Sequence, residues 1–453
     1  MSSADTIVAI STPPGRGGIG IVRLSGPEAA SISAQLVELH HPLEAGRARL
    51  ASVLDEDSVQ IDEAVVTFFA TPHSYTMEDV VEIAAHGSPV VLDFLLRRAI
   101  GLGARLAEPG EFTQRAFLSG RLDLTQAEAV RDLIEAQTLT QARQAARQLG
   151  GALSHRVAPI KQDLVDLIAL LEAGIDFAED DVDVTPKQEI AHRIEALSPA
   201  LTALEASFAR GRIVHDGLTL AIVGRPNAGK SSLFNRLVER DRAIVTATPG
   251  TTRDLVTERI AIDGIPIELV DTAGLRQNIE GLIDEVEQIG IHRSREALAD
   301  AAIVLVVLDA TQPLNEEEHR LLAAVEGRPA LVAINKSDLL DRPPTVEARQ
   351  LPVLSTSAKT GKGIAALRQK IVALATGGAA SEPGMLTNLR QHQAIQTALA
   401  ALGEAATANT DSIPHEMILL DLYRALWALD SLTGQTTPDD ILHLIFSRFC
   451  IGK

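Results

Sequence analysis

The segment GRPNAGKS, residues 224–231, limits the fold of this chain more than any other stretch. The aliphatic run LTLAIV precedes it, and SLFNRLV, which has helical spacing, follows it. A G-x-x-x-x-G-K-S pattern between a strand and a helix predicts a loop whose backbone N–H groups surround phosphates at a helix N-terminus. In such a loop Lys230 reaches the terminal phosphates and Ser231 ligates Mg²⁺. The segment therefore predicts a nucleoside triphosphate site on an α/β domain.

Aliphatic runs recur between about residues 218 and 374, and helical stretches separate them. This alternation predicts a parallel sheet with helices on both faces. Asp263 and Gly264 stand between two strand-like runs, VTERIAI and IPIELV, which is a hairpin signal. We therefore expect one edge strand of the sheet to be antiparallel.

Two later motifs select the base. The motif NKSD, residues 335–338, follows a buried strand-like run and places Asp338 at the carboxyl edge of the sheet. There its carboxylate can accept hydrogen bonds from N1–H and the 2-amino group of guanine, a donor pair that adenine lacks. The motif SAK, residues 357–359, follows LPVLST and supplies a loop over the base. The order and spacing of these motifs after Lys230 predict GTP as the nucleotide.

The stretch DTAG, residues 271–274, resembles that of the translation-factor-related branch of P-loop GTPases. Asp271 ends a strand and can hold the Mg²⁺ shell through water, while the amide of Gly274 can sense the γ-phosphate. Leu275 stands where Ras-like enzymes carry the glutamine that orients the attacking water. Hydrolysis therefore needs another device.

The sequence offers two such devices. Asn227 and the segment TATPGTT, residues 246–252, resemble the potassium-dependent GTPases, in which a monovalent cation takes the place of an arginine finger. The second device is Glu287 in DEVEQIGI, although an acid read there alone is typical of an exposed helix face. The resemblance implies Ser231 and Thr252 as Mg²⁺ ligands, and Asn227, Thr246, Thr248 and Thr251 as K⁺ ligands. The residues predicted to bind GTP are Asn227, Ala228, Gly229, Lys230, Ser231, Ser232, Thr246, Ala247, Thr248, Pro249, Gly250, Thr251, Thr252, Asp271, Thr272, Ala273, Gly274, Asn335, Lys336, Asp338, Ser357, Ala358 and Lys359.

The rest of the chain changes character on each side of this domain. Residues 1–120 mix strand-like runs with a helix and predict an α+β domain. Residues 121–215 carry apolar residues at helical spacing. A Ras-like G domain is expected over 216–376, and after a Gly/Ala/Ser/Pro-rich linker residues 377–453 are again helical. The predicted fold is multidomain, with helices on both sides of an α/β domain.

Composition excludes several classes of protein. One cysteine cannot form a disulfide within the chain, and the N-terminus lacks the basic and apolar regions of a signal peptide. The longest apolar runs, such as residues 301–308, fall far short of the roughly 18 residues of a membrane span. We therefore expect a cytoplasmic protein without a membrane segment. A net charge of -19 argues against a general polyanion binder, so contact with nucleic acid is expected to be local.

Motifs at both ends of the chain suggest a family. They are TPPGRGGIGIVRLSG at 12–26, HSYTMEDVVEIAAHG at 73–87, EPGEFTQRAFLSGRLDLTQAEAV at 108–130 and FCIGK at 449–453. In this order, and with a GTPase segment carrying TPGTTRD between them, they resemble the MnmE (TrmE) family of tRNA-modification GTPases. The resemblance runs from Asp5 to Lys453.

This resemblance implies a homodimer of three-domain chains: a folate-binding N-terminal domain, a helical domain built from two segments, and a G domain inserted between them. With an FAD-dependent partner of the MnmG (GidA) type, in a heterotetramer or larger complex, such proteins add an aminomethyl or carboxymethylaminomethyl group to carbon 5 of the wobble uridine of certain tRNAs. The implied one-carbon donor is 5,10-methylenetetrahydrofolate, with 5-formyltetrahydrofolate as its analogue. Taken alone, the G domain is also consistent with a second function, that of a regulatory GTPase in ribosome assembly.

The family's folate contacts correspond to Arg23, Glu82, Arg121 and the terminal Lys453. Cationic residues suit the carboxylates of the folate glutamate tail, and a glutamate suits the donor edge of a pterin. Arginine at 121 replaces a lysine of relatives, which changes the hydrogen-bond geometry. The family's catalytic glutamate corresponds to Glu287, and Lys230 serves the same reaction.

Cys450, the single cysteine of the chain, has two possible interpretations. A nucleophilic role suits the family's chemistry. Residue type alone favours simple burial, because cysteine is among the most buried residues.

Overall fold

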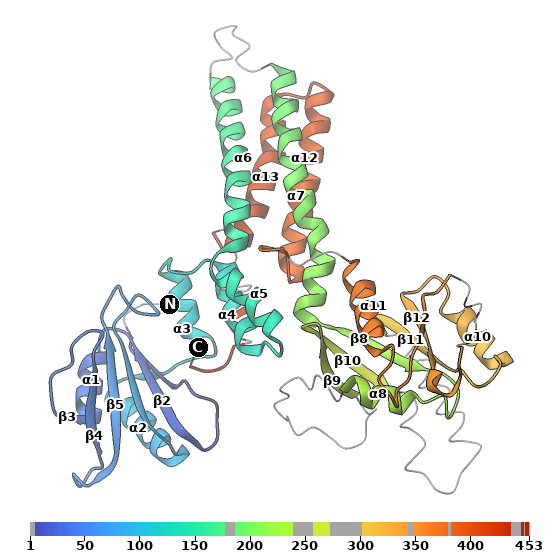
Figure 1. The fold of residues 1–453 in the computed structure, drawn as a ribbon. Helices are drawn as coiled ribbons and strands as arrows, with labels where there is room; N and C mark the ends of the chain where they lie inside the picture. The colour runs from blue at the N-terminus through green and yellow to red at the C-terminus, as the bar shows by residue number, and fades with distance from the viewer. Residues whose placement is uncertain are drawn as a thin grey trace, which may run out of the picture. The chain divides into compact units, whose positions relative to one another are not determined.

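The computed structural model describes residues 5–176, 186–238, 257–271, 301–342, 344, 346, 348, 350–378, 382–435, 445–447 and 449–452 (Figure 1). The chain divides into two compact units. The first contains residues 1–131, 148–154 and 426–453, and the second contains residues 132–147 and 155–425. The predicted domain boundaries, 1–120, 121–215, 216–376 and 377–453, stay a prediction.

A seven-stranded sheet forms most of the first unit, in the order β3-β4-β5-β6-β2-β1-β7. All neighbouring strands are antiparallel except β1 and β7, which are parallel. The helices of this part are α1 (Ala29–Leu36), α2 (Pro89–Gly101) and α3 (Glu111–Leu118). The strands are β1 (Ile7–Ile10), β2 (Gly17–Ser25), β3 (Val37–Leu39), β4 (Ala48–Leu54), β5 (Gln60–Phe69), β6 (Val80–Gly87) and β7 (Arg105–Leu106).

Helices α1 and α2 cover one face of this sheet. Ile32 of α1 and Leu95 of α2 pack with Val66 of β5 and Ile83 of β6 in one buried cluster. Alternate residues of β5 point the other way and are exposed, which is the pattern of an antiparallel strand with one covered face. The mixture of strands and helix predicted for residues 1–120 is confirmed.

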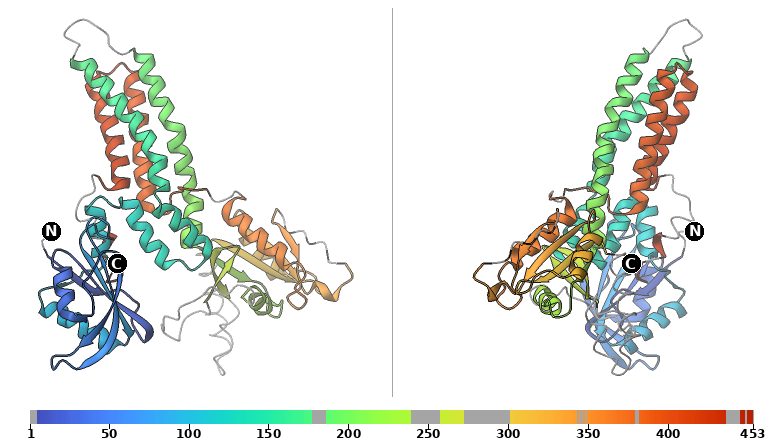
Figure 2. Two further views of the ribbon diagram at one scale, coloured as in Figure 1. Left: turned by 60° about the vertical axis from the view of Figure 1, so that its left-hand side comes forward. Right: turned by 90° about the vertical axis from the view of Figure 1, so that its right-hand side faces the viewer.

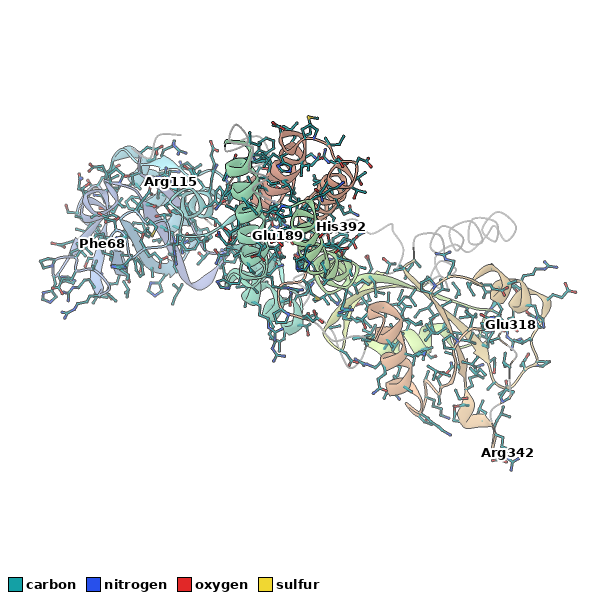
Figure 3. All side chains as sticks on the ribbon, turned by 90° about the horizontal axis from the view of Figure 1, so that it is seen from above. Phe68, Arg115, Glu189, Glu318, Arg342 and His392 are labelled. Atoms are coloured by element: carbon teal, nitrogen blue, oxygen red, sulfur yellow. The ribbon has the colours of Figure 1, made fainter. Side chains whose placement is uncertain are left out.

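Long helices follow this sheet in the chain, and further helices follow a second sheet, which we call the G sheet because it lies within the predicted G domain. In Figures 1 and 2, α6, α7, α12 and α13 lie side by side along much of their length. The ring of His392 on α12 stacks on Phe208 of α7 at a centroid distance of 4.0 Å (Figure 3). These helices are α4 (Leu124–Glu135), α5 (Leu139–Leu149), α6 (Ala152–Asp176), α7 (Lys187–Asp216), α12 (Leu389–Thr410) and α13 (His415–Thr433). The predicted helical character of both segments is confirmed.

A second sheet, in the order β13-β12-β11-β8-β10-β9, lies between α7 and α12 in the sequence. Only β9 is antiparallel to its neighbour, and it is an edge strand, as the Asp263-Gly264 turn predicted. The remaining pairs are parallel. The strands are β8 (Leu218–Val223), β9 (Thr257–Ile262), β10 (Ile265–Asp271), β11 (Ile303–Asp309), β12 (Ala330–Asn335) and β13 (Val353–Ser355).

Helices cover both faces of this second sheet. On one face, Leu220 and Ile222 of β8 belong to the same cluster as residues of α8 (Lys230–Val238) and α11 (Ile364–Thr376). On the other, Ala221 and Val223 pack in a cluster with residues of α10 (Glu316–Ala324). Every residue of β11 and β12 is buried, as expected for parallel strands that are covered twice.

None of the helices within the described residues is long and apolar enough to cross a membrane.

Candidate functional sites

The loop between β8 and α8 carries the predicted phosphate-binding segment. Gly224 has a φ of 149°, and a Cβ there would lie 2.2 Å from the carbonyl oxygen of Val307. Gly229 has a φ of 91°, and its Cβ would lie 2.2 Å from Nδ2 of Asn335. Both positions therefore need glycine, for backbone conformation and for space. Side chains at these two positions would collide with the backbone of β11 and with Asn335, so glycine lets the loop lie close to both.

Lys230 opens α8 and is buried. Its Nζ donates to the carbonyl oxygens of Gly224 at 2.8 Å and Arg225 at 2.9 Å, so the ammonium lies across the loop. Arg225 Nε is 3.3 Å from Oε1 of the buried Glu318 on α10. Each neighbouring helix thus holds the loop through one charged side chain, Lys230 of α8 and Glu318 of α10.

Asn335 and Asp338 lie at the carboxyl end of β12, where the sequence predicted the base. The side chain of Asn335 connects the phosphate loop to the SAK motif. Its Nδ2 donates to Ala228 O at 3.1 Å, and its Oδ1 accepts from Ala358 N at 3.0 Å. Ser357 Oγ donates to Asp338 Oδ1 at 2.6 Å. This hydrogen bond holds the pKa of Asp338 below its ordinary value, so the carboxylate is ionised and ready to accept.

Lys336 adopts a left-handed conformation, with a φ of 64°, and turns the chain from β12 into the short 3₁₀ helix Ser337–Leu339. Its Nζ is 2.7 Å from Oδ2 of Asp309, the last residue of β11. Burial acts to raise the pKa of Asp309, but the hydrogen bonds from Lys336 and Thr311 hold it below its ordinary value. Asp309 was not predicted from the sequence, and its place after a buried aliphatic run is the signal that could have found it.

Several predicted residues fall outside the described part of the chain. Asp271 ends β10, as predicted, and nothing is described of its side chain. The others are Thr246, Ala247, Thr248, Pro249, Gly250, Thr251, Thr252, Thr272, Ala273, Gly274, Glu287 and Lys453. The predicted Mg²⁺ and K⁺ ligands are therefore only partly described. Among those that are, Asn227 is exposed within the loop and has a φ of 63°.

A second group of predicted residues meets on the first sheet. Arg23, near the end of β2, and Glu82, near the start of β6, are register partners. Arg23 Nη2 lies 2.7 Å from Glu82 Oε1, with both side chains mostly buried. The pair lies on the face opposite α1 and α2, because the neighbouring residues Val22 and Ile83 pack under those helices.

Tyr75 links this pair to Arg121. The guanidinium carbon of Arg23 is 5.9 Å from the centroid of the Tyr75 ring, and that of Arg121 is 5.1 Å from it. Arg23 also lies 5.7 Å from the ring of Phe112 on α3. The Tyr75 hydroxyl is 2.9 Å from Thr113 Oγ1, and burial raises its pKa, so the phenol stays neutral. Two cations, one carboxylate and two aromatic rings therefore converge.

The C-terminal segment ends at the same place. The carbonyl oxygen of Gly452 accepts from Arg23 Nη1 at 3.2 Å and from Ser11 Oγ at 3.1 Å. Gly452 has a φ of 95°, and its Cβ would lie 2.7 Å from Ile10 O, so only glycine fits this approach. Lys453, the next residue, lies outside the described part of the chain.

The burial expected for Cys450 is wrong, since the residue is exposed. Phe446 and Phe449 fill the apolar cluster beneath this segment, while Ile451 is half exposed. The preference of cysteine for burial is an average, and here two larger apolar side chains take the buried positions.

Two family models match the chain. "GTP-binding protein TrmE N-terminus" matches residues 6–121, and "MnmE helical domain" matches residues 124–450. The tRNA modification GTPase MnmE of Koribacter versatilis (strain Ellin345) is 57% identical over 459 residues, which cover 100% of both chains. The chain belongs to the MnmE family of tRNA modification GTPases.

Other MnmE proteins align over the same length. That of Nitrosomonas europaea is 43% identical, covering 100% of both chains. That of Chloroflexus aurantiacus is 42% identical, covering 99% of this chain and all of its own. The α+β domain, the helices and the P-loop α/β domain are therefore the parts of an MnmE architecture, and GTP hydrolysis in tRNA modification is the activity of the family.

Proposed function

We propose that this protein hydrolyses GTP to drive the addition of an aminomethyl or carboxymethylaminomethyl group to carbon 5 of the wobble uridine of certain tRNAs. It acts with an FAD-dependent MnmG (GidA) type partner, in a heterotetramer or larger complex in the cytoplasm. The observation that carries the proposal is the presence, in one MnmE-family chain, of a guanine nucleotide cradle and a separate arginine–glutamate site closed by the C-terminal segment.

Guanine selectivity is supported by Asp338, whose ionised carboxylate accepts from N1–H and the 2-amino group. Phosphate binding is supported by the cradle of Gly224 and Gly229 and by Lys230, whose ammonium lies across the loop. Ser231, Thr252 and, through water, Asp271 would hold Mg²⁺, which neutralises charge that develops on the phosphates. Glu287 is the proposed catalytic glutamate.

Potassium would supply the charge that other GTPases take from an arginine finger. Leu275 cannot orient water, and Asn227 places an amide oxygen in the phosphate loop from an exposed left-handed position. Asn227, Thr246, Thr248 and Thr251 are the proposed ligands. GTP turnover should therefore be markedly faster in potassium than in sodium, because a fixed cation stabilises the transition state. Equal turnover in the two salts would remove Asn227 from this role.

The second site fits a tetrahydrofolate. Glu82 accepts from the donor edge of a pterin, Arg23 holds that carboxylate at 2.7 Å, and Arg121 offers a further cation for a folate carboxylate. The Tyr75 ring between the two arginines offers an aromatic face to a flat ring. Lys453 would add a third cation. When bound, 5,10-methylenetetrahydrofolate supplies the one-carbon unit, and the protein residues bind and orient it.

An open apolar row on the first sheet supports the proposed homodimer. Leu50, Val65, Ala84 and Ile21 are successive register partners across β4, β5, β6 and β2, on the face opposite α1 and α2. Leu50 is 53% exposed and Val65 is 42% exposed. A second copy of the same sheet would remove this row from water.

The decisive experiment is a nucleoside mass-spectrometric digest of tRNA from a strain that carries Lys230→Ala. Loss of the wobble-uridine modification is expected, because the phosphate-loop ammonium is removed. A Lys370→Ala strain is the matched control, since Lys370 is an exposed lysine of α11, and it should keep the modification. Normal modification in the Lys230→Ala strain would reject the proposal. If that strain instead accumulated ribosomal assembly intermediates, a regulatory GTPase of ribosome assembly would replace it.

A further inference from the structure

Arg236 of α8 belongs to none of the motifs above, yet it holds the loop that follows β13. Its Nε donates to Ala358 O at 3.0 Å, and its Nη2 donates to Lys359 O at 2.8 Å. We propose that Arg236 is the positioning residue for guanine recognition: its fork turns the backbone N–H groups of the SAK loop toward the base. This inference rests on the proposed binding of GTP.

The geometry of the peptide bond gives the first step. In a planar trans peptide, the carbonyl of one residue and the N–H of the next point in opposite directions. Because Ala358 O faces Arg236, Lys359 N–H faces away from it. Because Lys359 O also faces Arg236, Thr360 N–H points away too, and it donates to Ser357 Oγ at 3.1 Å.

The second step identifies what lies on that side. Ser357 Oγ, which receives Thr360 N–H, donates in turn to the guanine-binding carboxylate of Asp338 at 2.6 Å. The N–H groups of both peptides that Arg236 fixes are therefore on the side of Asp338. Guanine carries the acceptor O6 next to N1–H, whereas adenine carries an amino group there. Lys359 N–H is the donor that we assign to O6.

The side of this loop that faces Arg236 borders a cavity. A cavity of about 480 Å³ is lined there by Arg236, Thr360 and Gly361 together with residues of α11. On the other side of the loop, Ala358 N donates to Asn335 Oδ1 at 3.0 Å. Within the loop, Ser357 N donates to Lys362 O and Gly361 N donates to Ser357 O, both at 2.9 Å, and the hydrogen bonds from Arg236 add the connection to α8 on the cavity side. Arg236 reaches the two carbonyls with two different nitrogens, Nε and Nη2, held in a fixed fork, whereas lysine has a single nitrogen on a flexible stem.

The test measures binding of GDP and of 6-thio-GDP, which keeps N1–H and the 2-amino group but has sulfur, a weak acceptor, in place of O6. Wild-type protein should prefer GDP about 10-fold, the effect of one hydrogen bond in a preorganised site. In Arg236→Ala and Arg236→Lys, GDP affinity should fall about 10-fold. The preference for GDP over 6-thio-GDP should fall below about twofold, because the donor to O6 is no longer held.

Arg236→Lys keeps the charge and most of the stem, so it tests the fork even if the alanine variant folds poorly. Lys370→Ala on α11 is the control for charge, and both its GDP affinity and its preference for GDP over 6-thio-GDP should equal those of the wild type.

In GTP turnover, KM should rise in Arg236→Lys while kcat stays within about twofold, because the base rather than the phosphates loses a contact. The inference would be overturned if Arg236→Lys kept the wild-type preference for GDP over 6-thio-GDP. It would also be overturned if this variant lowered kcat and left KM unchanged. A wild-type protein that binds ADP as well as GDP would instead overturn the proposed nucleotide itself.

Discussion

The two sheets of this protein bury their residues in different ways. In the parallel G sheet, every residue of β11 and β12 is buried, because helices lie on both faces. In the antiparallel N-terminal sheet, β5 alternates, and Val65 is 42% exposed on the face that α1 and α2 leave open. Strand direction is the cause, since parallel strands need crossover helices that cover the sheet.

This difference decides where each sheet can bind a ligand. Both faces of the G sheet are occupied, so its polar residues emerge at strand ends, where Asp309, Asn335 and Asp338 lie. The N-terminal sheet has α1 and α2 on one face only, so Arg23 and Glu82 can project from within their strands on the other face rather than from strand ends. Burial pattern along a strand thus indicates whether a site should be sought at its end or along its face.

The largest expected effect concerns stability. Leu305→Ala in β11 removes a fully buried side chain between covering helices and should destabilise the G sheet by about 2–5 kcal/mol. Val65→Ala in β5 should cost less than about 1 kcal/mol, because its side chain is partly in water already. Hydrogen exchange of β11–β12 and β5–β6 amides in the full chain reports each sheet separately. Similar losses at both sites would break the comparison.

The next effect concerns the cradle at the strand ends. In Gly229→Ala the new Cβ would lie 2.2 Å from Asn335 Nδ2, and Asn335 cannot turn away without losing its bonds to Ala228 and Ala358. GDP affinity should fall at least about 30-fold, measured by calorimetry. Gly327→Ala is the control, because Gly327 also has a positive φ, 79°, but nothing lies within 4 Å of its Cβ. A comparable loss in the control would assign the effect to backbone strain alone.

On the open sheet, Glu82→Gln should weaken binding of 5-formyltetrahydrofolate about 10-fold, since a charged acceptor is replaced by a neutral amide. The GDP affinity of the variant should not change, because the guanine site is built on the other sheet. Glu63→Gln, an exposed acid of β5, is the matched control. Unchanged folate affinity in Glu82→Gln would remove this glutamate from the site.

The sequence was most informative where one motif lies within a few residues. The phosphate loop, NKSD and SAK each combine a strand end with a turn, so their places at the sheet edge could be predicted. Arg236 could not be found in this way, because its partner Ala358 lies 122 residues further along the chain. Strand β7 was missed for a similar reason: it is two residues long and exists only by pairing with β1.

The average preference of cysteine for burial also gave a wrong prediction for Cys450, which is exposed. Tyr75 lies inside a motif that the sequence did identify, HSYTMEDVVEIAAHG. Its position between Arg23 and Arg121 required the fold.

The smallest effect concerns how each sheet is joined to helices. Leu124, Phe446 and Phe449 form an apolar cluster in the first unit, next to α3. In the second unit polar contacts add to the apolar packing of Ile213: His215, just before β8, lies 3.1 Å from Asp132 of α4 and 2.7 Å from Asp216. Thr138 Oγ1 also donates to Gly264 O of the β9–β10 turn at 2.7 Å. Only the polar junction should respond to pH.

The hydrogen bond to Asp132 raises the pKa of His215 to about 9, from an ordinary value of 6.5. A group whose pKa is raised on folding stabilises the protein fully below its unfolded pKa and loses that contribution as pH rises through its folded pKa. The imidazolium should therefore stabilise this junction below about pH 6.5, and the contribution should disappear between about pH 6.5 and 9. We expect about 1 kcal/mol, because the ring is a quarter exposed and water screens the pair. His215→Gln should melt earlier than wild type at pH 6 and at the same temperature at pH 9.5, whereas a constant difference across this range would show that His215 acts by packing alone.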